Sequence, residues 1–252
     1  MDARCRYRVF IVCLVGLLAI SILVNWCAYL AIKGLYRQNL LLGLHPAGLV
    51  TSERPLLQIE SDPCQALVLL MGDSRVAQWH PAPRVRGACV VNIGIPGITS
   101  AQCLLAAEAE LERLSPRVIV LQIGINDIKA VGAFPEAGEA ILAATVENVR
   151  TLANLAAKHD CRLVLTSVIA PGDPEFLRYF VWSGVVYDFV TALNARLGNL
   201  ESHGAYWLEC NMFLSHNGKI RHEFSVDCFH LNHAAYEAIN VRLEPLLEGL
   251  VR

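Results

Sequence analysis

The sequence carries little charge. Only 17% of its 252 residues are Asp, Glu, Lys or Arg, and 21 basic against 23 acidic side chains leave a net charge of −2. Proteins that bind nucleic acid through its phosphates have a basic excess, so we expect no nucleic-acid partner. Intrinsic disorder requires low hydrophobicity and high net charge. It is excluded, because 54% of the residues are hydrophobic and the mean hydropathy is +0.42.

Motifs for metal binding and for glycosylation are missing as well. The nine cysteines form no Cys-x-x-Cys pair. The C-terminal histidines have spacings that fit no familiar zinc pattern: His216, His222, His230 and His233. We therefore expect no metal and assign no cofactor. No Asn-x-Ser/Thr sequon occurs, so glycosylation does not indicate a eukaryotic or a bacterial compartment.

One long apolar run stands near the N-terminus. Of the 24 residues 9–32, 21 are apolar, the exceptions being Gly16, Ser21 and Asn25. As a helix this run would be roughly 36 Å long, enough to cross a hydrocarbon core of about 30 Å. A cleaved signal peptide has a shorter apolar run of about 7–15 residues. The run predicts a transmembrane anchor at 9–32, with a signal peptide as the alternative.

Basic residues flank this run unevenly. Three arginines lie in residues 1–8, whereas Lys33 and Arg37 follow the run. Because basic flanks favour the cytoplasmic side of a membrane, we expect residues 1–8 to be cytoplasmic. The remainder would be exported, to the periplasm in a bacterium, as part of a single-pass membrane protein.

Beyond the anchor, short apolar runs alternate with helical patterns. The runs are rich in Val, Ile and Leu and lack polar alternation, which is typical of parallel strands buried on both faces. Five such runs occur, at 66–71, 88–93, 118–123, 162–169 and 205–210. Helical patterns cover 100–114, where Ser100 is the expected cap, and 136–158, 184–200 and 233–249.

This alternation predicts the fold class. We expect an α/β, doubly wound, flavodoxin-like sheet of five parallel strands flanked by helices. It would form one domain over residues 64–252, preceded by the transmembrane helix. Residues 33–63, which are rich in Gly and Pro, are interpreted as a connector.

Polar and glycine residues gather where the predicted strands end, which is where open α/β sheets bind ligands. These segments are Gly-Asp-Ser at 72–74, Asn-Ile-Gly-Ile-Pro-Gly at 92–97, Gly-Ile-Asn-Asp at 124–127 and Asp-Cys-Phe-His at 227–230. Each has an ordinary explanation as a turn or a loop when it is taken alone. Their order along the chain, at successive strand ends, indicates a single site.

Together these segments resemble the SGNH hydrolase family, also called GDSL-type esterases and lipases. The matching stretches are MGDSRVAQW, NIGIPGIT, QIGINDI and DCFHLNHAAY, within roughly residues 66–245. The resemblance implies a serine ester hydrolase. It implies the nucleophile Ser74, the general base His230, the orienting acid Asp227, and oxyanion donors on Gly97, Asn126 and the amide of Ser74.

The residue types suit these roles. A serine hydroxyl is a poor nucleophile until a neighbouring imidazole takes its proton. Asp227, three residues before His230, can reach the Nδ1–H of that imidazole and fix its tautomer. The negative charge of a tetrahedral intermediate needs N–H donors that no side chain obstructs, which suits Gly97, and Asn126 adds a side-chain amide.

Arginine and cysteine residues near the site leave alternatives open. Arg75 follows the serine where the family often has an apolar residue. It either binds an acidic group of the substrate or, as we favour, pairs with a nearby carboxylate.

Cys228 could be a second nucleophile, but a packing or disulfide role is the simpler interpretation. Six cysteines beyond the anchor allow up to three disulfides, whereas Cys89, Cys103 and Cys161 lie in apolar runs typical of buried free thiols.

Several functions are consistent with a membrane-anchored domain that resembles the SGNH hydrolases. Small acyl esters on carbohydrate are the expected substrates, because exported relatives often act on polysaccharide acetyl groups. Lipid esters such as lysophospholipids come next, because a membrane anchor keeps the site near lipid. A polysaccharide O-acetyltransferase would use the same residues, and a non-catalytic binding module is disfavoured by the filled catalytic positions. Six aromatic residues in 176–189 could line an acyl pocket, stack on sugar or touch the membrane.

Overall fold

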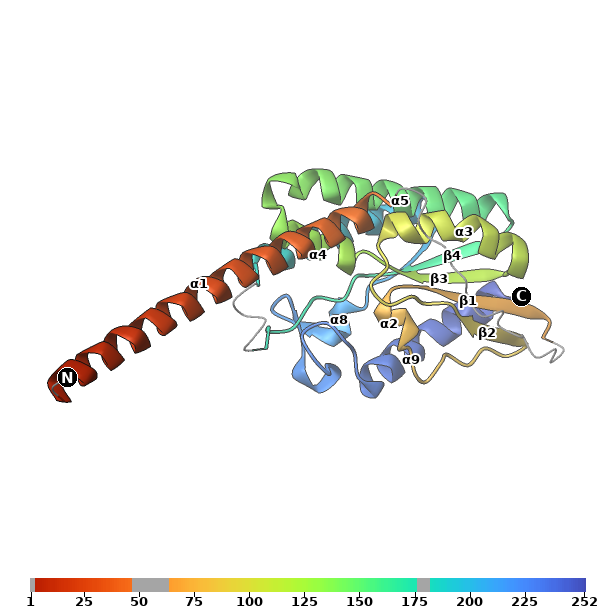
Figure 1. The fold of residues 1–252 in the computed structure, drawn as a ribbon. Coiled ribbons are helices and arrows are strands. Elements are labelled where there is room, and N and C mark those ends of the chain that lie inside the picture. Colours follow the sequence, from red (N-terminus) through yellow and green to blue (C-terminus); the bar gives the residue numbers. More distant parts are fainter. Residues whose placement is uncertain (1–2, 47–63, 176–181) are drawn as a thin grey trace. The chain divides into compact units, whose positions relative to one another are not determined.

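The computed structural model describes residues 3–46, 64–175 and 182–252. It divides into two units, Met1–Leu42 and Gly43–Arg252, and each is described by itself. The described residues of the first unit form a single helix, α1 (Ala3–Leu44), which ends two residues beyond the boundary of that unit (Figure 1). This helix is long and apolar enough to cross a membrane, and none of its apolar window is buried. A signal sequence would have the same character.

Helix α1 extends further than the predicted anchor at both ends. It continues through Lys33 to Leu44, so that the start of the predicted connector is helical. Single glycines such as Gly34 cost a helix only about 1 kcal/mol each, and no proline occurs before Pro46. Residues 47–63, the rest of that connector, lie outside the described residues.

The second unit is built on five parallel strands in the order β2-β1-β3-β4-β5. Their bounds are Ala66–Gly72 for β1, Ala88–Asn92 for β2, Val118–Gln122 for β3, Arg162–Thr166 for β4 and Tyr206–Leu208 for β5. This order is that of flavodoxin-like, doubly wound sheets. The predicted fold class is therefore confirmed, and all five apolar runs are strands.

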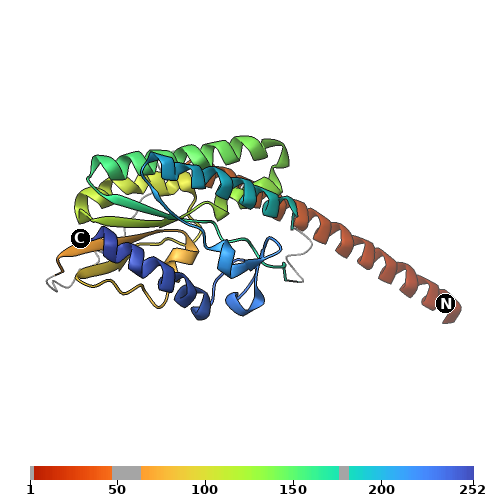
Figure 2. The same cartoon turned by 180° about the vertical axis from the view of Figure 1, so that it is seen from behind.

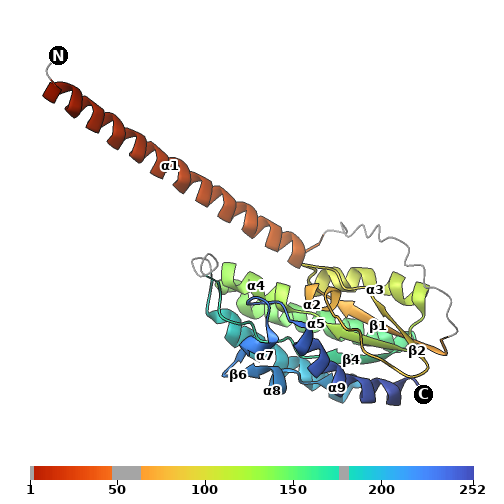
Figure 3. The same ribbon diagram turned by 90° about the horizontal axis from the view of Figure 1, so that it is seen from below.

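Helices cover both faces of this sheet (Figures 2 and 3). One layer contains α3 (Ser100–Leu114), α4 (Ile125–Ala133), α5 (Gly138–Lys158) and α7 (Val185–Gly198). The opposite layer contains α9 (His233–Leu250), whose Ile239, Leu243 and Leu247 pack in one core cluster with Val68 and Val120 of the sheet. Short elements fill the connections: α2 (Ser74–Ala77), η1 (Pro135–Ala137), η2 (Asn199–His203), α8 (Asn211–Leu214), β6 (Ser215–His216), β7 (Lys219–Ile220) and η3 (His222–Phe224).

The helical patterns differ from the structure in detail. Thr99, not Ser100, caps α3, and it forms a capping box with Gln102. The expected helix at 136–158 is divided between η1 and α5. Helix α4 was not predicted, because its nine residues begin inside the polar segment that follows β3. That segment is therefore the first turn of a helix and not a loop.

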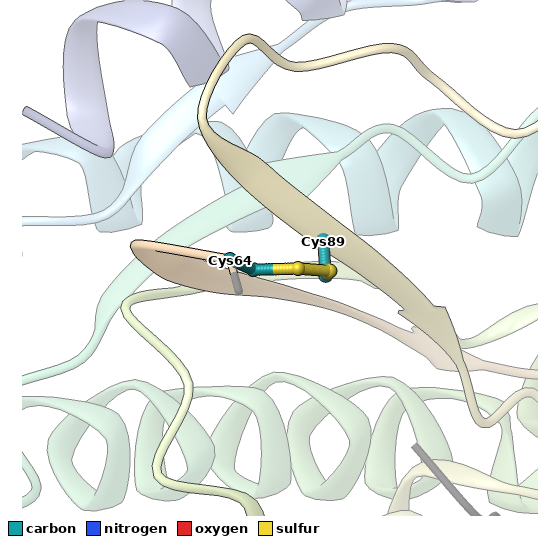
Figure 4. The surroundings of a disulfide bond; sticks show 2 residues. All are labelled: Cys64 and Cys89. Atoms are coloured by element: carbon teal, nitrogen blue, oxygen red, sulfur yellow. A yellow bond between two sulfur atoms is a disulfide. The ribbon is translucent and has the colours of Figure 1, made fainter. Parts of the chain in front are cut away.

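A disulfide joins Cys64 to Cys89 (Figure 4). Cys64 stands just before β1 and Cys89 lies in the edge strand β2. The interpretation of Cys89 as a buried free thiol was wrong, because its sulfur is bonded to that of Cys64, three residues before Leu67, its paired residue in β1. Four cysteines of this unit are buried and carry no disulfide: Cys103, Cys161, Cys210 and Cys228.

Candidate active site

The predicted nucleophile Ser74 lies directly beyond β1, at the start of α2. Strand β1 ends at Gly72, where the backbone requires glycine: its φ is +152°, and a Cβ would lie 1.9 Å from the carbonyl oxygen of Gln122 in β3. Asp73 then caps α2, because its side chain accepts the N–H of Arg75 at 2.9 Å. Ser74 is thereby held, half-buried, at the carboxyl edge of the sheet.

The predicted acid and base are in direct contact. Oδ2 of Asp227 lies 2.7 Å from Nδ1 of His230. The other oxygen, Oδ1, accepts the backbone N–H groups of Phe229 and of His230, each at 2.7 Å. One carboxylate thus bonds the imidazole and folds the turn that carries it. The side chains of both residues are about 30% exposed, at 31% for Asp227 and 29% for His230, so the imidazole is open to solvent.

These hydrogen bonds fix the charge of Asp227. Burial by itself would raise the pKa of this carboxyl, but the bonds from the His230 side chain and from the two backbone N–H groups outweigh burial. They lower the pKa of Asp227 to about 2. The group is therefore a carboxylate throughout the neutral range, as an orienting acid must be.

The two predicted oxyanion residues are linked through Ile98. Gly97 is exposed and has a φ of +79°, so that glycine is favoured there by the backbone and not by crowding. Asn126, in the first turn of α4, donates from Nδ2 to the carbonyl oxygen of Ile98 at 2.9 Å. Its Oδ1 accepts Nζ of Lys129 at 3.0 Å, which fixes the orientation of the amide. Nδ2 carries two hydrogens, and the bond to Ile98 uses one of them.

A family model for GDSL-like lipases and acylhydrolases matches residues 70–238, which include every residue of the predicted site and more than half of the chain. The chain belongs to the GDSL-like lipase/acylhydrolase family. Membership confirms the resemblance described above and makes the chain an enzyme of the carboxylic-ester hydrolase class. No curated protein sequence matches it significantly.

Solved structures of this family share the fold. A GDSL-like lipase from Bacteroides thetaiotaomicron is 22% identical with a TM-score of 0.60, over 73% of this chain and 89% of its own. A carbohydrate acetylesterase family member from Sinorhizobium meliloti is 14% identical with a TM-score of 0.57, over 74% and 99%. A variant of an acetyl xylan esterase from Geobacillus stearothermophilus is 16% identical with a TM-score of 0.55, over 73% and 94%. At these identities the likeness concerns the fold alone.

Arg75, the residue after the serine of this GDSL-like chain, is buried near the carboxylate of Asp73, but its described side-chain hydrogen bonds go elsewhere. Its side chain is 1% exposed, which is incompatible with capture of a substrate group at the surface. Its bonds go to main-chain carbonyls and not to a carboxylate. Nε donates to the oxygen of Phe229 and Nη1 to the oxygen of Ile169, each at 2.8 Å. The backbone oxygen of Arg75 accepts the hydroxyl of Tyr236 at 2.7 Å.

Asp127 is a second carboxylate of the GDSL-like site, and it was given no role from the sequence. It is fully buried and accepts the N–H of Ser100 at 3.0 Å and the hydroxyl of Ser100 at 2.6 Å. Burial raises the pKa of Asp127 to about 6, although the bonds from Ser100 oppose that rise. The contact ties the start of α3, just beyond Gly97, to the helix that carries Asn126. Its position beside Asn126 was the available signal.

The remaining cysteine and histidine candidates differ in their surroundings. Cys228 is buried, and its backbone N–H donates to Oε1 of Glu175 at 2.9 Å. Asp227, Cys228 and Glu175 form the described group close enough to share a metal ion, and it contains no histidine. Besides His230, the three C-terminal histidines named in the sequence analysis are exposed: His216, His222 and His233.

Aromatic residues border the turn that carries His230. The ring of Trp182 lies 5.4 Å from that of Phe229 and 5.7 Å from that of Tyr187. Nζ of Lys129 lies 4.0 Å from the centre of the Phe229 ring. Three of the six aromatic residues noted in the sequence lie outside the described residues: Phe176, Tyr179 and Phe180. The described part of this segment therefore packs beside the turn that carries His230.

Proposed function

We propose that the chain hydrolyses carboxylic esters through Ser74, His230 and Asp227. The bond between Asp227 Oδ2 and His230 Nδ1, at 2.7 Å, carries the proposal. In a neutral imidazole an acceptor at Nδ1 holds the hydrogen there, so that Nε2 presents its lone pair as a general base. Family membership supports the same assignment of roles.

The reaction proceeds in two halves. Oγ of Ser74 attacks the ester carbonyl carbon while its proton passes to Nε2 of His230. The bond between the acyl carbon and the alcohol oxygen then breaks, and His230 gives the proton to the leaving alcohol. A water molecule next loses a proton to His230 and attacks the acyl carbon. The acid is released, and the proton returns to Oγ of Ser74.

Negative charge on the carbonyl oxygen is met by the N–H groups of Ser74 and Gly97 and by Nδ2 of Asn126. In the described part of the chain the N–H of Gly97 has no hydrogen-bond acceptor, which leaves it available to a ligand. Such donors act strongly because they are already in place when the charge develops.

Small acyl esters on carbohydrate are the substrates we propose. Trp182 and Tyr187, half-buried beside the turn that carries His230, are residues of the types that stack on sugar rings. Two neighbours in fold are named as a carbohydrate acetylesterase family member and an acetyl xylan esterase. Lipid esters are the second candidate, since α1 is apolar enough to hold the enzyme at a membrane.

We propose that residues 9–32 anchor the enzyme in a membrane, with residues 1–8 in the cytoplasm and residues 64–252 exported. The basic residues before the apolar run support this orientation. The disulfide between Cys64 and Cys89 supports an oxidising compartment. A reporter that is active only outside the cytoplasm, fused after Arg252, is expected to be active. Activity of a cytoplasm-only reporter in its place would contradict the orientation.

The test is hydrolysis of aryl esters from acetyl to long-chain acyl by the full chain in detergent micelles. Ser74→Ala is expected to reduce turnover to the uncatalysed background. Cys228→Ala, a buried neighbour of the site that is given no catalytic role, is the matched control and is expected to stay active. Ser74→Ala with wild-type turnover would overturn the proposal.

The acyl-chain profile selects the substrate class. A preference for acetyl favours carbohydrate esters, and a preference for long chains favours lipids. Serine-dependent transfer of acetyl to an added sugar, in place of release to water, would identify the O-acetyltransferase alternative.

A further inference from the structure

The turn at Asp227–His230 is organised from within. Both oxygens of Asp227 are used inside it, on the N–H groups of Phe229 and His230 and on the imidazole. These bonds set the position of the imidazole relative to its own acid. They do not set the distance between the imidazole and Ser74, because Ser74 lies near the other end of the family match, at residues 70–238.

Arg75 spans that gap. It is the residue after Ser74, and its Nε donates at 2.8 Å to the backbone oxygen of Phe229, the residue before His230. The two residues are 154 positions apart in the sequence. A rigid side chain therefore links the backbone that carries the nucleophile to the backbone that carries the general base.

The guanidinium is also braced on its other side. Nη1 donates at 2.8 Å to the backbone oxygen of Ile169, just beyond β4, and Ile169 is completely buried. Because the five donors of a guanidinium have a fixed planar arrangement, holding one nitrogen on Ile169 fixes where Nε points. Through Arg75, the backbone of Phe229 is therefore held in place by the end of β4 as well as by α2.

Packing alone does not explain an arginine here. Burying a charged side chain is costly unless its donors are satisfied, and a large apolar side chain would fill much of the same volume without that cost. Asp73 lies close enough to stabilise the charge. The two bonds to Phe229 and Ile169 require two donors on one planar group, which only an arginine side chain supplies.

We propose that Arg75 is a positioning residue that sets the separation between Ser74 and His230. This inference rests on the proposed function. Loss of the guanidinium would leave the Asp227–His230 pair intact but displaced from Ser74. A displacement of about 1 Å can reduce turnover on the order of 100-fold without loss of substrate binding.

The experiment compares three variants of the full chain in detergent micelles. Arg75→Met removes both bonds and keeps an unbranched side chain that extends about as far as Nε, and Arg75→Lys keeps the charge without the planar fork. Tyr236→Phe is the matched control, because it removes a buried bond to the backbone oxygen of Arg75 and leaves the guanidinium in place. Each is measured for kcat and KM on an aryl acetate, for the melting temperature, and for the low-field proton NMR signal of His230 Nδ1–H.

We expect Arg75→Met to lower kcat on the order of 100-fold with KM unchanged, and Arg75→Lys to recover part of that loss. The low-field signal should persist in both. Tyr236→Phe should lower the melting temperature with kcat near the wild-type value. This combination separates displacement of the pair from a general loss of structure.

Other outcomes overturn the inference. Wild-type kcat in Arg75→Met would do so, as would an equal kcat loss in Tyr236→Phe, or disappearance of the low-field signal together with kcat. If Arg75→Met does not fold, Arg75→Lys decides: a lower kcat at an unchanged melting temperature supports the inference, and an unchanged kcat overturns it. Wild-type protein that neither hydrolyses esters nor reacts at Ser74 with a fluorophosphonate would instead refute the proposed function, and the inference with it.

Discussion

Two aspartates at the same edge of the sheet are bonded in similar ways and have opposite pKa shifts. Asp227 is partly exposed, and hydrogen bonds lower its pKa to about 2. Asp127 is fully buried, and burial raises its pKa to about 6 despite the bonds from Ser100. The first orients the imidazole of the proposed general base, and the second joins two helices beside the proposed oxyanion donors.

The two pKa shifts have opposite signs because the two carboxylates differ in burial and in hydrogen bonding. Asp227 accepts hydrogen bonds from two backbone N–H groups and from the imidazole of His230. These bonds favour its charged form and also hold the turn that carries His230. Asp127 accepts hydrogen bonds from Ser100 and from its own backbone, and these bonds do not offset the effect of its complete burial on the pKa. Local hydrogen bonds therefore determine the pKa of Asp227, the proposed catalytic acid, whereas burial determines the pKa of Asp127.

Asp227→Asn should give the largest effect. An amide cannot favour the Nδ1–H tautomer of His230 as a carboxylate does, so kcat should fall about 10⁴-fold while the protein remains folded. Steady-state hydrolysis of an aryl acetate, together with circular dichroism, provides the measurement. Near-normal turnover would remove Asp227 from the mechanism and end the functional half of the comparison.

Asn126→Ala should come next, with kcat reduced by about 10²–10³-fold through loss of one oxyanion donor. The matched control is Asn148→Ala. Nδ2 of Asn148 donates to the hydroxyl of Ser100 at 2.9 Å, and this hydroxyl in turn donates to Asp127. This control should retain kcat and lose about 1 kcal/mol of stability. Equal kcat losses in the two variants would assign Asn126 to the scaffold.

Asp127→Asn should change the pH dependence of stability. The folded-state pKa of about 6 exceeds the unfolded value of about 3.8, so the folded wild type is favoured below pH 4 and loses that advantage as the pH rises through 6. Relative to Asp127→Asn, the wild type should lose up to about 3 kcal/mol between pH 4 and pH 7. Chemical unfolding across this range tests the slope, and parallel curves would show that Asp127 does not titrate as described.

The stability of Asp227→Asn should show the smallest effect, with the opposite sign. Because the folded-state pKa of Asp227 is below its unfolded value, its contribution is present above about pH 4 and is lost as the pH falls towards 2. Its exposure to solvent makes the amplitude smaller than that of Asp127. Difference curves with the same slope for both aspartates would contradict the comparison.

The local part of the site could be predicted from the sequence. The apolar runs gave all five strands because strands buried on both faces have no other pattern. The spacing of Asp227 and His230 predicted their contact, since three residues are enough for a carboxylate to reach back to the following imidazole. Both inferences depend on short stretches of chain.

Contacts between distant segments could not be predicted. Arg75 reaches carbonyl groups 94 and 154 positions away, and a backbone carbonyl has no sequence signature. Ser100 and Asp127 meet across 27 positions, because the ends of β2 and β3 lie at one edge of the sheet. Helix α4 was missed because Gly124-Ile125-Asn126-Asp127 is equally typical of a loop.

The disulfide between Cys64 and Cys89 has a mechanical consequence. It closes a covalent ring of chain that contains β1 and the serine of α2. Tension applied from the N-terminal side of Cys64 passes through the two sulfur atoms to Cys89 and onward along the chain. The enclosed segment, Ser74 included, lies outside that load path. A pull transmitted from the first helix would therefore not be carried by the backbone of the nucleophile.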